Sequence, residues 1–191
     1  MSDRYPQDSA SGLFNARRLR WAIGLTILLV LVLVLLDSLE QTIARAEQQS
    51  AKLMLNQLRS ALLVKGAEAR LDGRRELADL AGVNPFEWFE NSPPNYSGLC
   101  DENGARIGNW CFKPAQTGNK GYKKYQQGDA GRVIFRPNQP ITLEERQGSH
   151  EAPLSWVVGI EFQDRNGNGR LDSDEPQTGL KLEPVGAGNT P

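Results

Sequence analysis

Cysteine and histidine are scarce in this chain. Its 191 residues include two cysteines, Cys100 and Cys111, and one histidine, His150. This set is too small for the four nitrogen and sulfur ligands of a structural zinc site. His150 stands between Ser149 and Glu151 in a predicted loop, and adjacency in sequence does not build a catalytic triad. Because the sequence also lacks a phosphate-binding loop, a dinucleotide-binding fingerprint and a Cys-x-x-Cys pair, we expect no enzymatic activity.

The chain also lacks a strong net charge. Its formal net charge is -1 at pH 7 and its pI is about 5.9. Nucleic-acid-binding domains usually carry a basic patch that attracts phosphates. We therefore expect no nucleic-acid partner.

A long uncharged segment lies close to the N-terminus. Residues 21–36 read WAIGLTILLVLVLVLL and lie between Arg20 and Asp37. With Leu39 included, the apolar length reaches the lower limit for a bilayer-spanning helix, and a helix pairs its own backbone groups in lipid. We therefore predict a transmembrane helix over residues 21–39.

The basic residues beside this segment predict its direction. Arg17, Arg18 and Arg20 precede it, whereas the first basic residue after it is Arg45. The positive-inside rule then places residues 1–20 in the cytoplasm as a tail and exports the remainder. We expect a single-pass protein of a bacterial inner membrane whose C-terminal region is periplasmic.

Three other roles for the apolar segment fit the sequence less well. A cleaved signal peptide would need small residues sooner after the segment than Ala44 and Ala46. A buried core helix would need apolar packing on every side. A pilin-type leader would place the apolar residues directly after Gly12-Leu13-Phe14, but basic residues follow there.

Residues 40–82 have the pattern of amphipathic helices. Apolar residues recur at three- and four-residue spacing from Leu39 to Val64. This apolar face can pack on the protein's own sheet or meet another single-span partner, and both can hold on successive turns. Asp72-Gly73 and Gly82 are expected to end the helices. Asn84-Pro85-Phe86-Glu87 has a capping-box pattern and predicts a helical turn over residues 85–90.

The remaining residues, 83–185, predict an α+β domain in which a helix packs on a small antiparallel sheet. Apolar residues alternate along 154–162, as in a half-buried strand. Shorter strands are predicted at 132–136, at 141–145 and around Leu180 and Leu182. Residues 186–191 are expected to be a disordered tail.

Cys100 and Cys111 flank a predicted reversal at Asn103-Gly104. We interpret this segment as a hairpin, and in an oxidising compartment its cysteines could form a disulfide. The alternative is two unpaired, buried thiols.

The most specific local pattern predicts a calcium site. Residues 164–175, DRNGNGRLDSDE, match the calcium-loop pattern D-x-[DN]-x-[DN]-G-x5-E. Calcium prefers six to eight hard oxygen ligands. The pattern assigns them to the side chains of Asp164, Asn166, Asn168, Asp172 and Glu175 and to the Arg170 carbonyl. A strand leads in and Pro176 follows, so we expect a stand-alone loop with a structural role and weak affinity, about 10⁻⁴ to 10⁻³ M. The alternative is a polar turn.

The order of these features resembles a known family. The resemblance covers residues 21 to about 146. The single apolar segment, the amphipathic helix and four short motifs carry it. The motifs are Asn84-Pro85-Phe86-Glu87-Trp88, Pro93-Pro94-Asn95-Tyr96, Gly108-Asn109-Trp110-Cys111-Phe112-Lys113-Pro114 and Val133-Ile134-Phe135-Arg136. The chain looks like the biogenesis protein F (MshF) family of the mannose-sensitive haemagglutinin (MSHA) type IV pilus system. Residues 116–131 form an insertion relative to that pattern.

The resemblance implies a pseudopilin-like accessory protein of a type IV pilus or type II secretion-like machine. Its implied partners are the inner membrane and other pilus or secretion-system subunits, reached through the N-terminal helix. A second hypothesis is a bitopic envelope protein, unrelated to pili, whose periplasmic domain binds a ligand or a cell-wall partner.

Overall fold

The computed structural model describes residues 10–72, 76–115 and 130–186. Outside this part lie residues 1–9, 73–75, 116–129 and 187–191. They include the start of the predicted cytoplasmic tail, most of the insertion at 116–131 and nearly all of the predicted disordered tail at 186–191. The chain divides into two compact units, Met1–Ile43 and Ala44–Pro191.

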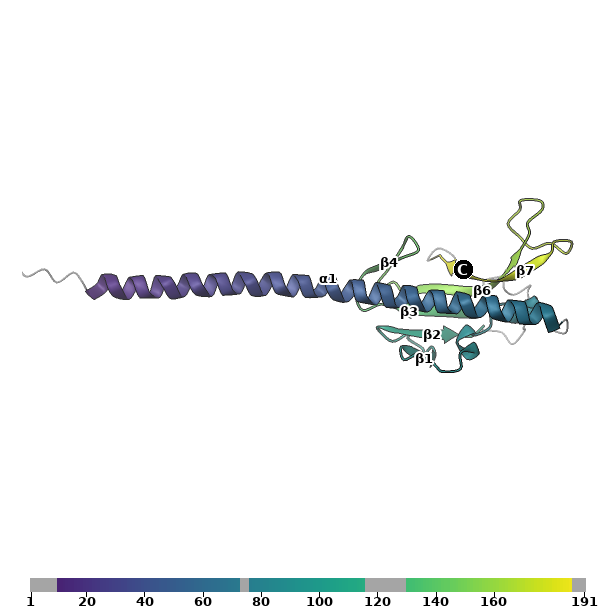
Figure 1. The fold of residues 1–191 in the computed structure, drawn as a ribbon, viewed down its shortest axis with the longest axis horizontal. Coiled ribbons are helices and arrows are strands. Elements are labelled where there is room, and N and C mark those ends of the chain that lie inside the picture. The colour runs from purple at the N-terminus through teal and green to yellow at the C-terminus, as the bar shows by residue number, and fades with distance from the viewer. Residues whose placement is uncertain (1–9, 73–75, 116–129, 187–191) are drawn as a thin grey trace, which may run out of the picture. The chain divides into compact units, whose positions relative to one another are not determined.

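The first helix, α1, runs from Ala10 to Asp72 (Figure 1). It contains one segment long and apolar enough to cross a membrane by length and composition, with a mean hydropathy of 2.7. From Leu19 to Leu39, within the first unit, the large apolar side chains are exposed, as Leu25 at 70% and Leu31 at 55% illustrate. Exposed Leu, Ile and Val side chains over this length are the surface expected of a lipid-facing helix.

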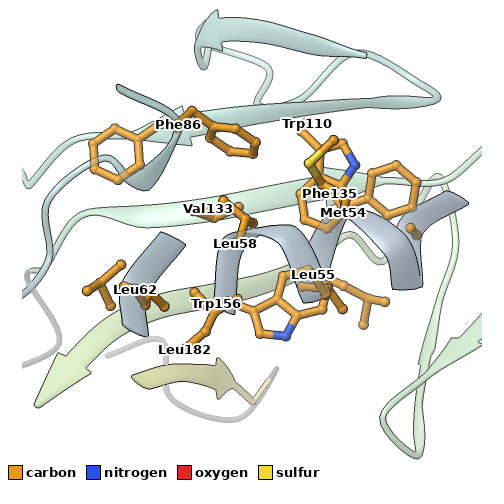
Figure 2. Close-up of a cluster of buried hydrophobic side chains, with 14 of the residues drawn as sticks. Met54, Leu55, Leu58, Leu62, Phe86, Trp110, Val133, Phe135, Trp156 and Leu182 are labelled. Atoms are coloured by element: carbon orange, nitrogen blue, oxygen red, sulfur yellow. The ribbon is translucent and has the colours of Figure 1, made fainter. Parts of the chain in front are cut away.

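In the second unit, α1 buries the predicted apolar face. Leu55, Leu58 and Leu62 are at most 1% exposed, and three- and four-residue spacing puts them on one side of the helix. Figure 2 shows these side chains pointing at Trp156 and Val133 of the sheet. The interpretation that this face packs on the protein's own sheet is therefore confirmed.

A five-stranded sheet forms the other layer of the second unit, in the order β1-β2-β3-β6-β7 (Figure 1). Its strands are β1 (Tyr96–Leu99), β2 (Asn109–Lys113), β3 (Arg132–Arg136), β6 (Leu154–Phe162) and β7 (Gln177–Val185). The predicted α+β class and the strands at 132–136, at 154–162 and around Leu180 are confirmed. In β6, Leu154, Trp156, Val158 and Ile160 are buried, as the alternation predicted.

The hairpin predicted between Cys100 and Cys111 is wrong. β1 pairs with β2 in parallel, with Tyr96 opposite Trp110 and Leu99 opposite Phe112. The predicted reversal is present, since the Gly104 N–H donates to the Asp101 carbonyl at 3.0 Å. However, this turn lies within the connection between the two strands and does not pair them, and β2 runs in the same direction as β1.

The strand predicted at 141–145 is shorter than expected. β4 (Ile141–Leu143) pairs with β5 (Arg146–Gly148) in a separate two-stranded sheet. Glu144 and Glu145 form the turn with φ values of 51° and 64°. The left-handed region is uncommon for residues other than glycine, and so the sequence carried no signal for this turn.

The described part of the second unit also contains two short helices, α2 (Leu77–Leu80) and the 3-10 helix η1 (Pro85–Trp88). η1 is shorter than the predicted turn over residues 85–90. Asn84 caps it, because its Oδ1 accepts from the Phe86 N–H at 3.2 Å. The Asn84 amide also donates to Glu87 at 3.1 Å and to the Tyr96 hydroxyl at 3.0 Å, which connects the cap to β1.

Candidate functional site

The predicted calcium loop connects β6 to β7, the two longest strands of the sheet. The Gln163 N–H donates to the Pro176 carbonyl at 3.1 Å and closes the base of the loop. The loop is therefore anchored on an antiparallel pair whose register runs from Ser155 opposite Val185 to Phe162 opposite Gln177. The absence of flanking helices agrees with the predicted stand-alone loop.

Asp164 organises the first half of the loop. Its Oδ1 accepts from the Gly167 N–H at 2.6 Å and its Oδ2 from the Gly169 N–H at 2.7 Å. Both glycines have positive φ, 74° and 70°, a conformation that costs glycine little. The hydrogen bond from Gly169, followed by that from Gly167, lowers the pKa of Asp164 although the side chain is exposed. Because the pKa is lowered, ionised Asp164 stabilises the folded loop at pH values above the ordinary pKa of an aspartate. This stabilisation is lost as the pH falls through the lowered pKa of the folded state.

Two asparagines connect the first half of the loop to the second. The Oδ1 atoms of Asn166 and Asn168 accept from the N–H groups of Asn168 at 3.0 Å and Arg170 at 2.6 Å. Their Nδ2 atoms both donate to Oδ2 of Asp172, at 2.6 and 2.8 Å. Three predicted ligand side chains therefore converge on one another.

Glu175 closes the loop from the far end. It is 6% exposed, although it carries a carboxylate. Its Oε1 accepts from the Arg165 N–H at 2.8 Å and its Oε2 from the Asp172 N–H at 3.1 Å. A buried carboxylate is costly unless its oxygens are paired, so these bonds hold the side chain in the loop interior.

The loop brings together oxygen donors of the kind that calcium prefers. The carboxylates of Asp164 and Glu175 each still have acceptor capacity beyond the bonds described. The Arg170 carbonyl accepts no hydrogen bond from the described chain. Among the described residues no group of three or more His, Cys, Asp or Glu side chains stands in a metal-holding arrangement. In this structure the loop is a hydrogen-bonded turn in which the Nδ2 atoms of Asn166 and Asn168 point at the Asp172 carboxylate.

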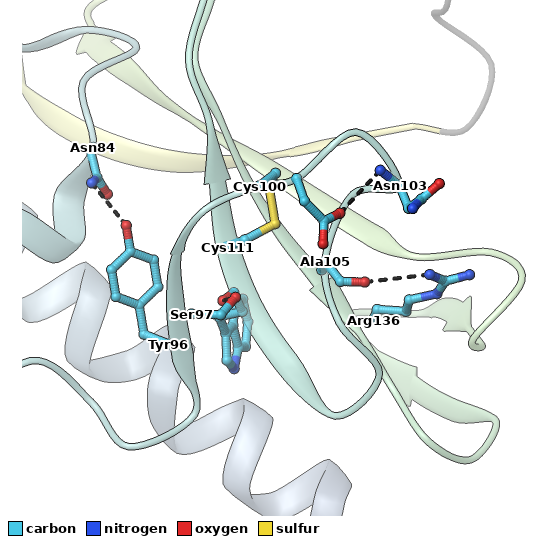
Figure 3. The surroundings of a disulfide bond; sticks show 10 residues. Asn84, Tyr96, Ser97, Cys100, Asn103, Ala105, Cys111 and Arg136 are labelled. Atoms are coloured by element: carbon cyan, nitrogen blue, oxygen red, sulfur yellow. Dashed lines mark hydrogen bonds between the residues drawn. A yellow bond between two sulfur atoms is a disulfide. The ribbon is translucent and has the colours of Figure 1, made fainter.

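The predicted disulfide between Cys100 and Cys111 is confirmed (Figure 3). It joins the residue after β1 to the fully buried Cys111 in β2. The Cys100 N–H also donates to the Phe112 carbonyl at 2.9 Å. The bond therefore fastens the short parallel edge strand to the sheet.

The residues around His150 do not come together as a catalytic group. The Ser149 hydroxyl accepts from the Ala152 N–H at 3.1 Å. His150 is half exposed and lies 3.7 Å from Glu151, and its carbonyl accepts from Arg136 at 2.5 Å.

Sequence reasoning missed a polar cluster around Glu144. The carboxylate accepts from Arg59 of α1 and, at 2.8 Å, from Nε1 of Trp156. Arg146 lies 3.8 Å from the same carboxylate, with its guanidinium over the Trp156 ring. The cluster joins α1, the β4-β5 hairpin and β6. No local spacing connects these residues, so the sequence offered no signal for it.

Removing the disulfide should destabilise the second unit. The cross-link closes a loop with a sequence separation of 11, for which chain entropy predicts a loss of about 3 kcal/mol in the free energy of unfolding. Denaturant melts of the full chain, oxidised and reduced, measure this difference. The double variant Cys100→Ala/Cys111→Ala is the control, since reduction should leave its melt unchanged. Equal stability of the wild type before and after complete reduction would contradict the prediction.

Comparison of the chain with protein-family models, with curated proteins and with solved structures finds no match.

Proposed function

We propose that this chain is a non-enzymatic accessory subunit or assembly factor of an MSHA-type IV pilus or type II secretion-like machine, anchored in the inner membrane. One observation carries the proposal. The single helix α1, from Ala10 to Asp72, contains both the membrane-length apolar segment and the face that packs on the sheet of the second unit. These two parts fit an accessory subunit that is held in the membrane by its N-terminal segment while its folded domain lies outside.

The orientation proposed for the membrane segment is an N-terminus in the cytoplasm and a periplasmic second unit. Its support is the cluster of arginines before the segment, which ends at Arg20. The disulfide adds support, because disulfides persist in oxidising compartments such as the bacterial periplasm.

Fusions at the two ends test this orientation. Alkaline phosphatase fused after Pro191 should be active, because it folds only after export, and the same enzyme fused after Asp37 should also be active. Replacing Arg17, Arg18 and Arg20 together with glutamate should reduce both activities, since it removes the charge bias. In the fusion after Pro191, the triple variant Arg45→Glu/Lys52→Glu/Arg106→Glu changes as many charges after the segment, all on exposed side chains, and should keep the phosphatase activity. An inactive C-terminal fusion would overturn the orientation.

Loss of the gene should abolish assembly. In a cell whose pilus or secretion genes include this one, deletion should remove surface pili or secreted substrate, and the full chain expressed in trans should restore them. A version with residues 21–36 replaced by a cleavable signal peptide exports the second unit without an anchor and should not restore assembly. Normal assembly in the deletion strain would contradict the proposal.

We further propose that the loop at 164–175 binds Ca²⁺ and that the ion has a structural role. The ligands would be the side chains of Asp164, Asn166, Asn168, Asp172 and Glu175 with the Arg170 carbonyl. The hydrogen bonds of Asp164 and Glu175 support this assignment, because they hold the two end carboxylates in the loop with acceptor capacity to spare. A bound cation would draw the amide oxygens of the asparagines inward in place of their nitrogens.

Thermal melts with calcium and with chelator test the calcium site. The full chain should melt at a higher temperature in millimolar Ca²⁺, because a ligand that binds only the folded state stabilises it. Asp164→Ala removes a proposed ligand and should abolish the shift. Asp174→Ala removes the same side chain from the same loop without removing a proposed ligand and should keep the shift. Equal melting temperatures with calcium and chelator would refute the site.

A further inference from the structure

A groove of ≈1190 Å³ lies on the second unit between α1 and the segment that follows η1. One wall is α1 from Ser50 to Lys65, and the other is formed by Trp88, Phe89 and residues 91–95. The groove exceeds the roughly 300–1,000 Å³ of a typical small-molecule site. Because the wall on α1 extends from Ser50 to Lys65, about 22 Å of helix, a ligand that follows this wall is extended.

The lining of the groove carries almost no charge. Among the described residues that line it, Lys65 is the only charged one, although charged residues make up 24% of the chain. The Lys65 ammonium lies 2.7 Å from the Glu68 carboxylate, so this charge already has a partner. Ionic ligands therefore find no counter-charge here.

Uncharged polar groups replace charges along both walls. They are five side-chain amides and three hydroxyls, on Asn56, Gln57, Asn91, Asn95, Asn109, Ser50, Ser60 and Ser92. Within the described part of the chain none of the five side-chain amides makes a hydrogen bond. Each side-chain amide can donate two hydrogen bonds and accept two. The walls therefore present neutral side-chain amides without a hydrogen-bond partner in the described part of the chain, whereas the Ser60 hydroxyl donates to the Asn56 carbonyl at 3.0 Å.

Apolar surface lies between these amides. Trp88 and Phe89 are half-buried and pack against the hydrophobic core, and Leu53 and Val64 are 63% and 56% exposed. Because Trp88 ends the capped helix η1, its ring is held on a fixed element. The groove thus combines a fixed aromatic side chain, aliphatic surface and amides.

We propose that this groove binds a glycan strand of β-1,4-linked N-acetylhexosamines. A pyranose ring has an apolar face that packs on an aromatic side chain and a rim of hydroxyls that pair with amides. The acetamido group adds a donor, an acceptor and a methyl group, which match the amides and the exposed Leu53 and Val64. An apolar partner helix would instead cover the amides without pairing them, which is unfavourable. The proposal goes beyond the proposed function and depends on neither the pilus assignment nor calcium.

Titration of the full chain in lipid nanodiscs, without glycoside detergents, tests the proposal. Tetra-N-acetylchitotetraose is the probe, and saturable binding is measured by calorimetry and ligand-observed NMR. Cellotetraose has the same linkage without acetamido groups and should bind about tenfold more weakly. Absence of saturable chitotetraose binding, or equal binding of the two sugars, would overturn the proposal.

Variants on the two walls locate the binding site. Gln57→Ala on α1 and Asn91→Ala on the opposite wall should each weaken chitotetraose binding by about threefold to tenfold. Trp88→Leu keeps apolar volume but removes the flat ring, and should weaken it about tenfold. Gln147→Ala removes an exposed glutamine in β5, which does not line the groove, and should bind as the wild type does.

Three outcomes would reject the groove as the sugar site. The first is an equal loss of binding in Gln147→Ala and Gln57→Ala. The second is wild-type binding in both Gln57→Ala and Asn91→Ala. These two variants test the site even if Trp88→Leu fails to fold. The third is a dimer of the full chain that Gln57→Ala dissociates and the sugar does not affect, which would assign the groove to a second copy.

Discussion

The second unit depends on one packed layer, in which a face of α1 lies on a face of the sheet. Leu55, Leu58 and Leu62 meet Trp156 and its neighbours there, and each is fully buried. Burial of one such aliphatic side chain contributes about 1.5–3 kcal/mol, so a few helical turns supply much of the stability of a small domain. The short helices and the β4-β5 hairpin contact this layer and add to it.

Polar contacts fix how the irregular segments lie on this layer. Glu144 receives hydrogen bonds from α1 and from β6, and Glu47 accepts from the N–H groups of Asn138 at 2.7 Å and Gln139 at 3.2 Å. Gln48 donates to the Thr142 carbonyl at 2.6 Å. Hydrogen bonds of this kind add less stability than apolar burial, but their directionality selects one position for the segment from Asn138 to Glu144.

Periodicity predicted the elements of the fold better than their partners. The alternation along 154–162 and the spacing of Leu55, Leu58 and Leu62 were sufficient because burial on one face determines both patterns. Strand direction was not predictable, since a period of two is the same in parallel and antiparallel pairs, and β1 was therefore misassigned. The turn at Glu144-Glu145 lacks glycine and asparagine, and only tertiary contacts account for it. At the candidate calcium loop, the spacing predicted which side chains lie near one another but could not specify which amide atoms face Asp172. The amides of the groove come from separate segments, α1, residues 91–95 and β2, so no single motif contains them.

The place of the disulfide has a consequence for how the domain opens. Cys100 and Cys111 join the edge strand β1 to β2, whereas the helix-packed layer is centred on β3 and β6. Regions with few buried contacts open at lower free energy than the core. Reduction therefore allows the edge strand β1 to open locally while the layer around β3 and β6 stays packed against α1. In hydrogen-exchange terms, reduction lowers the protection of the interior amides through the loss of global stability. For the amides of β1 it adds a local opening that the bond prevents in the oxidised protein.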